Sequence, residues 1–360
     1  MSSDAVPSES ATFWQSIHRA QAAINSLSLI LGPLPEPLTF SENPATSLLH
    51  DADISHDISS RLRHPGSGSG DDNLCRWLYD TFQSTDPGLQ LVVLNFLPTI
   101  VGVYLSRAIS RKPLAGFEAV MLALYAHETV IRGGEPQTVM LPNLTNPSLY
   151  HEAKAPTKSQ AVDLNIAVLS PALEPCGTVR STKRARIIGV ALELYYSKIH
   201  DLPLSSKLEF CEFCVDWAGQ NGPLEEEKHG NFKSDASCAD QQGETVQVKS
   251  GEEKHGKKRR KIPLPWELFQ PILRIIGYCL LGGSNSEELK EAALVAAQRL
   301  HLRALHDVNP QAILASRSLL RLAKMPGDTI LEPPIVSDSN DLTALERAKI
   351  EQSLANDMQN

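Results

Sequence analysis

The chain has 360 residues, a formal net charge of −8, 42% hydrophobic residues and 21% charged residues. These values are ordinary for a soluble globular protein, and the acidic balance argues against nucleic acid as a partner. Six cysteines without a regular spacing favour a reducing compartment over a disulfide-bonded scaffold. The N-terminal MSSDAVPSES lacks the basic and apolar regions of a signal peptide, so none is expected.

The first part of the chain predicts two helices and a linker. Residues 1–10 are expected to be disordered. Residues 11–31 predict an amphipathic helix, because apolar side chains recur at helical spacing. These are Trp14, Ile17, Ala20, Ile24, Leu27 and Ile30. Residues 45–64 predict a short second helix. The PGSGSGDD stretch at 65–72 has the composition of a flexible linker.

Residues 73–132 predict three apolar helices, at 73–84, 86–110 and 113–132. In the second, Asp86 is a predicted N-cap, Pro87 suits the first helical position, and Pro98 predicts a bend. This helix contains the apolar run 89–105, which is interrupted by polar residues and by Pro98. A membrane span needs about 20 mostly apolar residues. The run is therefore interpreted as a buried core helix.

The rest of the chain predicts further helices around a charged insert. Residues 161–175 fit short strands or irregular structure, and helices are expected at 182–200, 207–219, 265–283, 286–307 and 309–325. Residues 220–261 have the composition of a disordered charged insert, and 327–360 of a flexible tail. The predicted fold is all-α, with stacked helical hairpins or an irregular helical bundle, formed by residues 11–219 and 262–326.

Motifs that would indicate an enzyme are missing from the sequence. It contains no GxxxxGK[ST], HExxH or GxSxG, so we expect no catalytic residue, cofactor or metal. Cys211 and Cys214 form a CxxC without a second ligand pair, which favours two core cysteines over a zinc or redox site. An enzyme that uses these thiols with a histidine stays an alternative. His127 and His200 lie near predicted helix ends, where the helix dipole favours them.

A basic run lies at the end of the predicted insert. It consists of Lys257, Lys258, Arg259, Arg260 and Lys261. Such a run fits a solvated loop, a contact with anionic lipid or a partner, or a nuclear import signal, and the sequence leaves these alternatives open. The KRAR stretch at 183–186 adds a possible second basic spot.

The stretch LPNLTNPSLYHEAK at 141–154 resembles the hyccin family's segment IPsLsxPSxYHE. The apolar stretch 89–112 and GFEAVMLALYAHET at 116–129 resemble two helices of that family. The similarity spans about residues 70–325, and the short tail is that of a plant-like member. Its possible partner surface is the motif itself: Pro142, Asn143, Pro147, Ser148, Tyr150, His151 and Glu152. These residues are expected either to pack on the helical body or to shape a partner surface.

The resemblance implies a non-catalytic function. Hyccin-like proteins are accessory subunits of a plasma-membrane phosphatidylinositol 4-kinase complex (type III alpha). The implied partners are a tetratricopeptide-repeat scaffold, the kinase and a membrane-anchoring subunit. The implied localisation is the cytosol and, peripherally, the plasma membrane. An independent nuclear or adaptor protein that uses 257–261 is the alternative.

Overall fold

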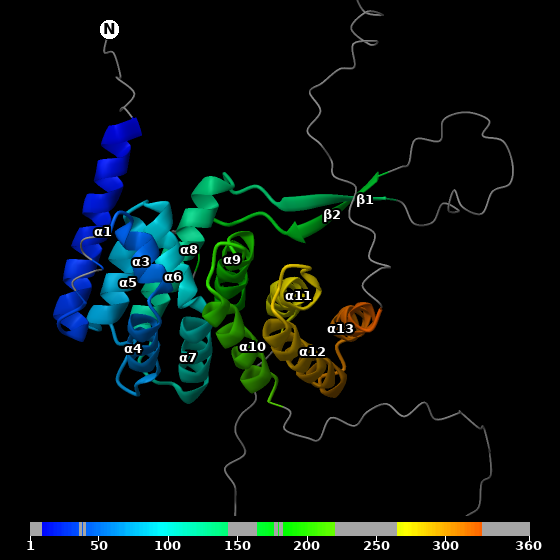
Figure 1. Ribbon diagram of the computed structural model, residues 1–360. Helices are drawn as coiled ribbons and strands as arrows, with labels where there is room; N and C mark the ends of the chain where they lie inside the picture. Colours follow the sequence, from blue (N-terminus) through cyan, green and yellow to red (C-terminus); the bar gives the residue numbers. More distant parts are fainter. Residues whose placement is uncertain are drawn as a thin grey trace, which may run out of the picture. The chain divides into compact units, whose positions relative to one another are not determined.

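The computed structural model describes residues 9–35, 38, 41–142, 164–175, 179, 183–219 and 265–325. The chain divides into one unit comprising Met1–Leu320 and another comprising Arg321–Asn360, and the packing below is that of the first unit. The described residues form twelve helices and one two-stranded sheet, which confirms the all-α prediction (Figure 1).

The elements follow one another along the chain with short connections between most of the helices. Their bounds are α1 (Glu9–Leu31), α3 (Pro44–His50), α4 (Ala52–Arg63), α5 (Asn73–Gln83), α6 (Pro87–Asn95), α7 (Leu97–Ser110), α8 (Ala115–Ile131), β1 (Gln137–Pro142), β2 (Leu164–Ser170), α9 (Arg184–Ser197), α10 (Leu204–Ala218), α11 (Trp266–Leu281), α12 (Glu287–His306) and α13 (Pro310–Ala323).

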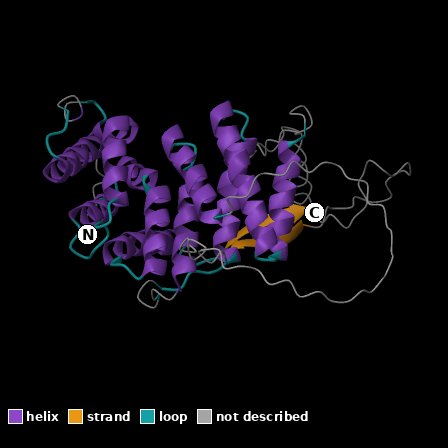
Figure 2. Cartoon of the chain, turned by 90° about the horizontal axis from the view of Figure 1, so that it is seen from below, coloured by secondary structure: helices purple, strands orange, loops and turns teal. Residues whose placement is uncertain are grey.

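The helices of the first unit pack in two rows. In one row α1 packs on α5, α5 on α8, α8 on α9 and α9 on α11. In the other row α4 packs on α7, α7 on α10 and α10 on α12, along the lower edge of Figure 1. Contacts of α7 with α8 and α9, and of α11 with α10 and α12, join the two rows. Figure 2 shows the same helices lying side by side in a second view. The arrangement fits the predicted stack of helical hairpins.

Side-chain caps begin several helices where the sequence predicts them. The buried carboxylate of Asp86 accepts a hydrogen bond from the Leu89 amide (3.0 Å) at the start of α6, with Pro87 at the first helical position. The Ser286 hydroxyl accepts one from the Leu289 amide (3.3 Å) at the start of α12. Each cap satisfies an amide that the helix itself leaves without an acceptor.

The predicted helix 86–110 is broken in two. Phe96 separates α6 from α7, and the two axes differ by 48°. A proline at position 98 would clash with the carbonyl of residue 94 inside a continuous helix. The break two residues earlier places Pro98 in the first turn of α7, where proline is tolerated. The bend is therefore confirmed, but it lies just before the proline rather than at it.

The apolar run across this break is buried, as expected for a core helix. Leu89, Val93, Ile100 and Val101 are each at most 1% exposed. Among the described helices, none alone has the length and apolar character of a membrane span, although α6 and α7 together meet both criteria.

Two expectations for the first 64 residues need correction. The region 45–64 forms two helices rather than one, because Asp51 caps a new helix by accepting from the Ile54 amide (2.9 Å). In α1, Ala20, Ile24 and Leu27 are buried as predicted, but Trp14 is 60% exposed. Helical spacing therefore identified the correct face of α1, but only its C-terminal half is covered.

The segment 65–72 is a packed turn, so the linker prediction is wrong. Ser67 and Gly68 are buried, and Arg107 of α7 donates hydrogen bonds to the His64 carbonyl (2.6 Å) and to Ser67 Oγ (2.9 Å). Gly68 has a φ of 77°, and a Cβ added there would overlap the ring of Phe117. Glycine and serine are common in linkers, but here their small size allows the backbone to pass close to α8.

Candidate interaction surface

Strands β1 and β2 form an antiparallel hairpin that contacts the helices little. Its register pairs Met140 with Ile166 and Thr138 with Val168, so these four side chains share one face. Met140, Ile166 and Val168 are 66%, 68% and 59% exposed. Cross-strand pairing places the three side chains next to one another. We call this set the hairpin face.

A buried charge network holds the base of the hairpin. The guanidinium of Arg132, just after α8, donates to Glu128 Oε2 (2.6 Å), to Glu193 Oε2 of α9 (3.1 Å) and to Ser170 Oγ at the end of β2 (3.1 Å). The side chains of Arg132, Glu128 and Glu193 are each at most 7% exposed. Because buried charges are costly unless paired and hydrogen-bonded, this cluster ties β2 to α8 and α9.

Further hydrogen bonds secure the segment that follows β2. The Leu173 amide donates to the Gly134 carbonyl (2.8 Å), and the hydroxyl of buried Tyr125 donates to the Glu174 carbonyl (3.1 Å). Arg186 of α9 donates to the carbonyls of Pro171 (2.5 Å) and Ala172 (3.2 Å). The hairpin therefore has a well-anchored base.

The basic side chains of the predicted spot at 183–186 largely make contacts within the chain. Arg184 donates to Tyr104 Oη (2.8 Å) and lies over its ring, and Lys183 pairs with Glu174. Arg186 contacts the segment after β2, as described above. Burial of the Tyr104 ring raises the pKa of its hydroxyl, so it remains protonated and acts as a neutral acceptor for Arg184.

Most of the residues singled out from the sequence lie outside the described residues. Pro142 is the last residue of β1, but Asn143, Pro147, Ser148, Tyr150, His151 and Glu152 are not described. They belong to the 143–163 segment that joins β1 to β2. The basic run from Lys257 to Lys261, the insert 220–261 and the tail from residue 327 are likewise outside. The hairpin therefore carries the family motif between its two strands.

Cys211 and Cys214 are core residues, as the sequence predicts. Both lie on α10 and are at most 1% exposed. A hydrogen bond with Cys279 and burial raise the pKa of Cys211, and burial raises that of Cys214, which keeps both thiols protonated. No group of three or more potential metal ligands occurs within the described parts of the chain.

The two histidines near helix ends, His127 and His200, each contact a neighbouring side chain. His127 packs edge-on against Phe82 (5.1 Å between ring centroids), and burial lowers its pKa. His200 lies beside Asp201 on the surface, with 3.4 Å between Nε2 and Oδ1.

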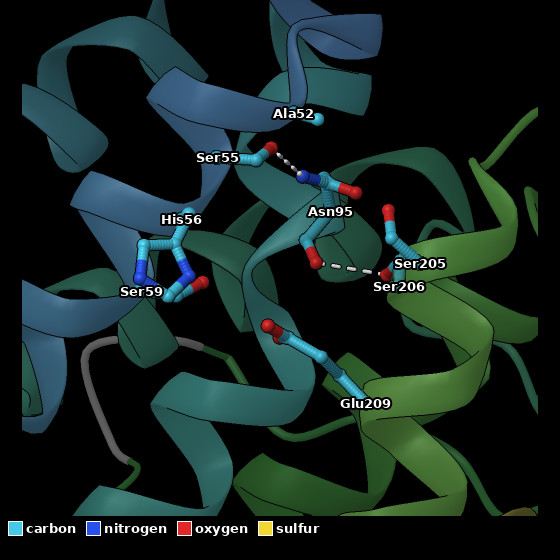
Figure 3. Close-up of a pocket in the computed structure, with 8 residues that line it drawn as sticks. All are labelled: Ala52, Ser55, His56, Ser59, Asn95, Ser205, Ser206 and Glu209. Atoms are coloured by element: carbon cyan, nitrogen blue, oxygen red, sulfur yellow. Dashed lines mark hydrogen bonds between the residues drawn. The ribbon is translucent and has the colours of Figure 1, made fainter.

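A small polar pocket opens where α4, the C-terminus of α6 and the N-terminus of α10 meet (Figure 3). Its volume is about 180 Å³. The lining side chains are Ala52, Ser55, His56, Ser59, Asn95, Ser205, Ser206 and Glu209. Because α6 ends at Asn95, the Asn95 carbonyl is available to accept a hydrogen bond from Ser206 Oγ (2.8 Å), which joins α6 to α10 beside the pocket.

Sequence reasoning missed both the hairpin face and this pocket. The expectation of short strands within 161–175 is confirmed by β2, but QTVMLP and LNIAVLS lack the regular alternation of apolar and polar residues that would have indicated an exposed apolar face. Nothing in the sequence brings Asn95 and Glu209 together, because they are far apart along the chain.

The chain matches the model of a known protein family. The family model described as Hyccin matches residues 39–326 of the chain. The matched range is well over half of the chain. It includes the hairpin, the LPNLTNPSLYHEAK motif and every described helix after α1.

Proposed function

The chain belongs to the hyccin family, and from that membership we propose that it is a non-catalytic subunit of a phosphatidylinositol 4-kinase complex. In this role it binds a tetratricopeptide-repeat scaffold and stabilises the scaffold together with the kinase. The complex then makes phosphatidylinositol 4-phosphate where its lipid substrate is. The family match carries this proposal.

The hairpin face is the surface that we assign to the scaffold. Met140, Ile166 and Val168 form one exposed apolar set on a hairpin whose base is anchored by Arg132. Covering such side chains contributes about 1–2 kcal/mol each. An anchored surface also loses little conformational entropy on binding. Both properties favour a stable subunit contact at this face.

Membrane localisation is proposed to come through the complex. The membrane-anchoring subunit brings the assembly to the plasma membrane, and the chain is peripheral there and otherwise cytosolic. The basic run from Lys257 to Lys261 supports contact with anionic lipid, since each basic residue near such a surface contributes about 1 kcal/mol.

Affinity purification followed by mass spectrometry tests this proposal. The tagged full chain is expected to retrieve a tetratricopeptide-repeat protein and a lipid kinase from cell extract. The triple variant Met140→Thr, Ile166→Thr, Val168→Thr should lose both. Threonine keeps a high strand propensity while it removes most of the apolar surface, so the hairpin itself should persist.

A matched control replaces exposed leucines elsewhere on the chain. Leu29→Gln on α1 and Leu314→Gln on α13 alter side chains that are 88% and 68% exposed, and these variants should still retrieve both proteins. Circular dichroism checks that all variants fold. If the wild-type chain retrieves no lipid-kinase component, the proposed function is wrong. If the triple variant retrieves them as well as wild type does, the contact surface lies elsewhere.

A further inference from the structure

The polar pocket between α4, α6 and α10 contains a buried side chain whose hydrogen bonding is incomplete. Asn95 is 4% exposed, and its Nδ2 donates to Ser55 Oγ (3.2 Å). Its Oδ1 has no hydrogen-bond partner among the described residues. Figure 3 shows this oxygen on the side of the amide that faces away from Ser55, toward the N-terminus of α10.

A buried polar atom without a hydrogen bond is costly, so Asn95 Oδ1 points to a partner that the chain itself does not supply among its described residues. A buried polar group without a hydrogen bond has lost its contact with water and gained nothing in exchange. Turning the Asn95 amide over would not remove the cost. Ser55 Oγ would then bond Oδ1, and Nδ2 would lack a partner instead. In either orientation one polar atom of the Asn95 amide, a residue of the pocket lining, lacks a partner among the described residues.

The charge of the lining decides which ligand fits. Glu209 is the only carboxylate among the lining residues, and none of them is a lysine or arginine. The remaining polar groups are serine hydroxyls, the Asn95 amide and the His56 ring. Figure 3 shows the Glu209 carboxylate extending from α10 toward α4. Oxygen acceptors beside a negative charge attract cations that carry hydrogen-bond donors.

Glu209 is held in this position by neighbours outside the pocket lining. Thr99 Oγ1 donates to its Oε2 (2.8 Å), and Arg63 Nη2 lies 3.5 Å from its Oε1. The Glu209 side chain is 27% exposed, so solvent only partly screens its charge. Arg63 is half exposed, and exposed ion pairs of this kind contribute little. The carboxylate therefore remains able to attract a second cation.

We propose that this pocket binds the ammonium or guanidinium group of a lysine or arginine side chain from a partner protein. A volume of about 180 Å³ accommodates the end of one such side chain, but not a nucleotide or a lipid headgroup with its chains. In the complex Asn95 Oδ1 accepts from the cation, and Glu209 supplies the opposite charge. The pocket is separate from the hairpin face, and the proposed cation binding does not depend on which complex the chain joins.

Small cations serve as probes of the pocket in the full chain. Methylguanidinium and methylammonium should bind with a dissociation constant of about 10 mM, measured by ligand-observed NMR, which corresponds to a weak single-group contact. Tetramethylammonium has the charge but no hydrogen-bond donor and should bind at least about tenfold more weakly, a difference of about 1.4 kcal/mol. Inorganic phosphate should not bind.

Two variants connect the binding to its residues. Asn95→Leu should abolish methylguanidinium binding, and Glu209→Gln should weaken it by about tenfold or more, as expected for loss of a charge-assisted contact. Glu212→Gln is the matched control, because Glu212 lies on the same helix and is exposed outside the pocket. Methylguanidinium should bind Glu212→Gln as strongly as it binds the wild-type chain. Thermal melting of each variant separates loss of binding from loss of folding.

The results that overturn the proposal are distinct from those that overturn the kinase-complex role. Failure of every cation to bind, equal binding to Asn95→Leu, or binding of phosphate instead would each contradict the pocket assignment. In the affinity purification, Asn95→Leu and Glu209→Gln should retrieve at least one wild-type partner at a reduced level. If both lose probe binding but retrieve every partner normally, the cation does not come from a partner protein.

Discussion

The turn at 65–72 and the hairpin formed by β1 and β2 each show the opposite of the burial that their compositions suggest. The turn consists of Gly, Ser, Pro and Asp, yet Ser67 and Gly68 are buried against α7 and α8. The hairpin strands consist mostly of apolar residues, yet the face formed by Met140, Ile166 and Val168 is exposed. Composition predicts which residues favour burial, but the surrounding packing decides which residues are buried.

Arginine has a similar role in both regions. Arg107 donates to the backbone and hydroxyl of the turn, and Arg132 links β2 to α8 and α9. Each guanidinium is buried, and its several donors allow it to join separate segments. Only Arg132 is paired with carboxylates, so its loss should have the greater effect.

The largest expected loss of stability comes from removing Arg132, which anchors the hairpin. Arg132→Met should lower the free energy of unfolding by about 3–5 kcal/mol, because Glu128 and Glu193 would be left buried without their cation. Urea denaturation measures the change. The control Arg76→Met removes an exposed arginine that pairs loosely with Asp80, and it should change stability by less than about 0.5 kcal/mol. Similar small losses in both variants would contradict the anchoring role.

The second-largest loss of stability is expected when the packing of the turn at 65–72 is disturbed. Gly68→Ala should destabilise the chain by about 3 kcal/mol, because the added Cβ overlaps the Phe117 ring and φ is 77°. Gly70→Ala in the same turn should be nearly neutral, since its Cβ would meet only Ala115, at 3.8 Å. Equal stability of the two variants in chemical denaturation would show that the turn is a linker after all.

A smaller effect is expected from a single hydroxyl in the turn. Ser67 Oγ donates to the Leu62 carbonyl (2.5 Å) and accepts from Arg107. Ser67→Ala should therefore cost about 1–2 kcal/mol, because two buried polar groups lose a partner. Ser60→Ala, at an exposed position of α4, should cost nothing measurable. Thermal unfolding of both variants provides the comparison, and no difference between them would argue against the buried contact.

The smallest effect is expected on the hairpin face. Val168→Thr should change the free energy of unfolding by less than about 0.5 kcal/mol, because the side chain is 59% exposed. Val120→Thr makes the same change at a fully buried position of α8, where a hydroxyl should cost about 1–3 kcal/mol. A large loss in Val168→Thr would mean that the hairpin face is covered within the chain itself.

Helix positions were predictable because their signals are local. The apolar composition and spacing of 73–84 and 113–132 predicted α5 and α8, and Asp86 with Pro87 identified the start of α6. These signals act within one or two turns of a helix. The break at Phe96 was displaced from its predicted position because proline is accommodated in the first turn of the next helix.

The surfaces were less predictable because they depend on distant segments. The hairpin face requires the pairing of Met140 with Ile166 across a long connection, and neither strand has the regular alternation of apolar and polar residues that would have indicated it. The pocket requires Asn95 and Glu209, whose residue types alone indicate nothing unusual. In the turn, only the positions of Arg107 and Phe117 explain why Gly68 is buried.

The sequence by itself determined most of the helices, the cap at Asp86 and the family motif, since each depends on neighbours within a few residues. The tertiary structure alone decided which of these surfaces are covered. It buried a glycine-rich turn, exposed the apolar face of the hairpin and left Asn95 Oδ1 without a hydrogen-bond partner among the described residues. The physical reason is that burial is a property of contacts between segments, and helical periodicity carries no information about which segments will meet.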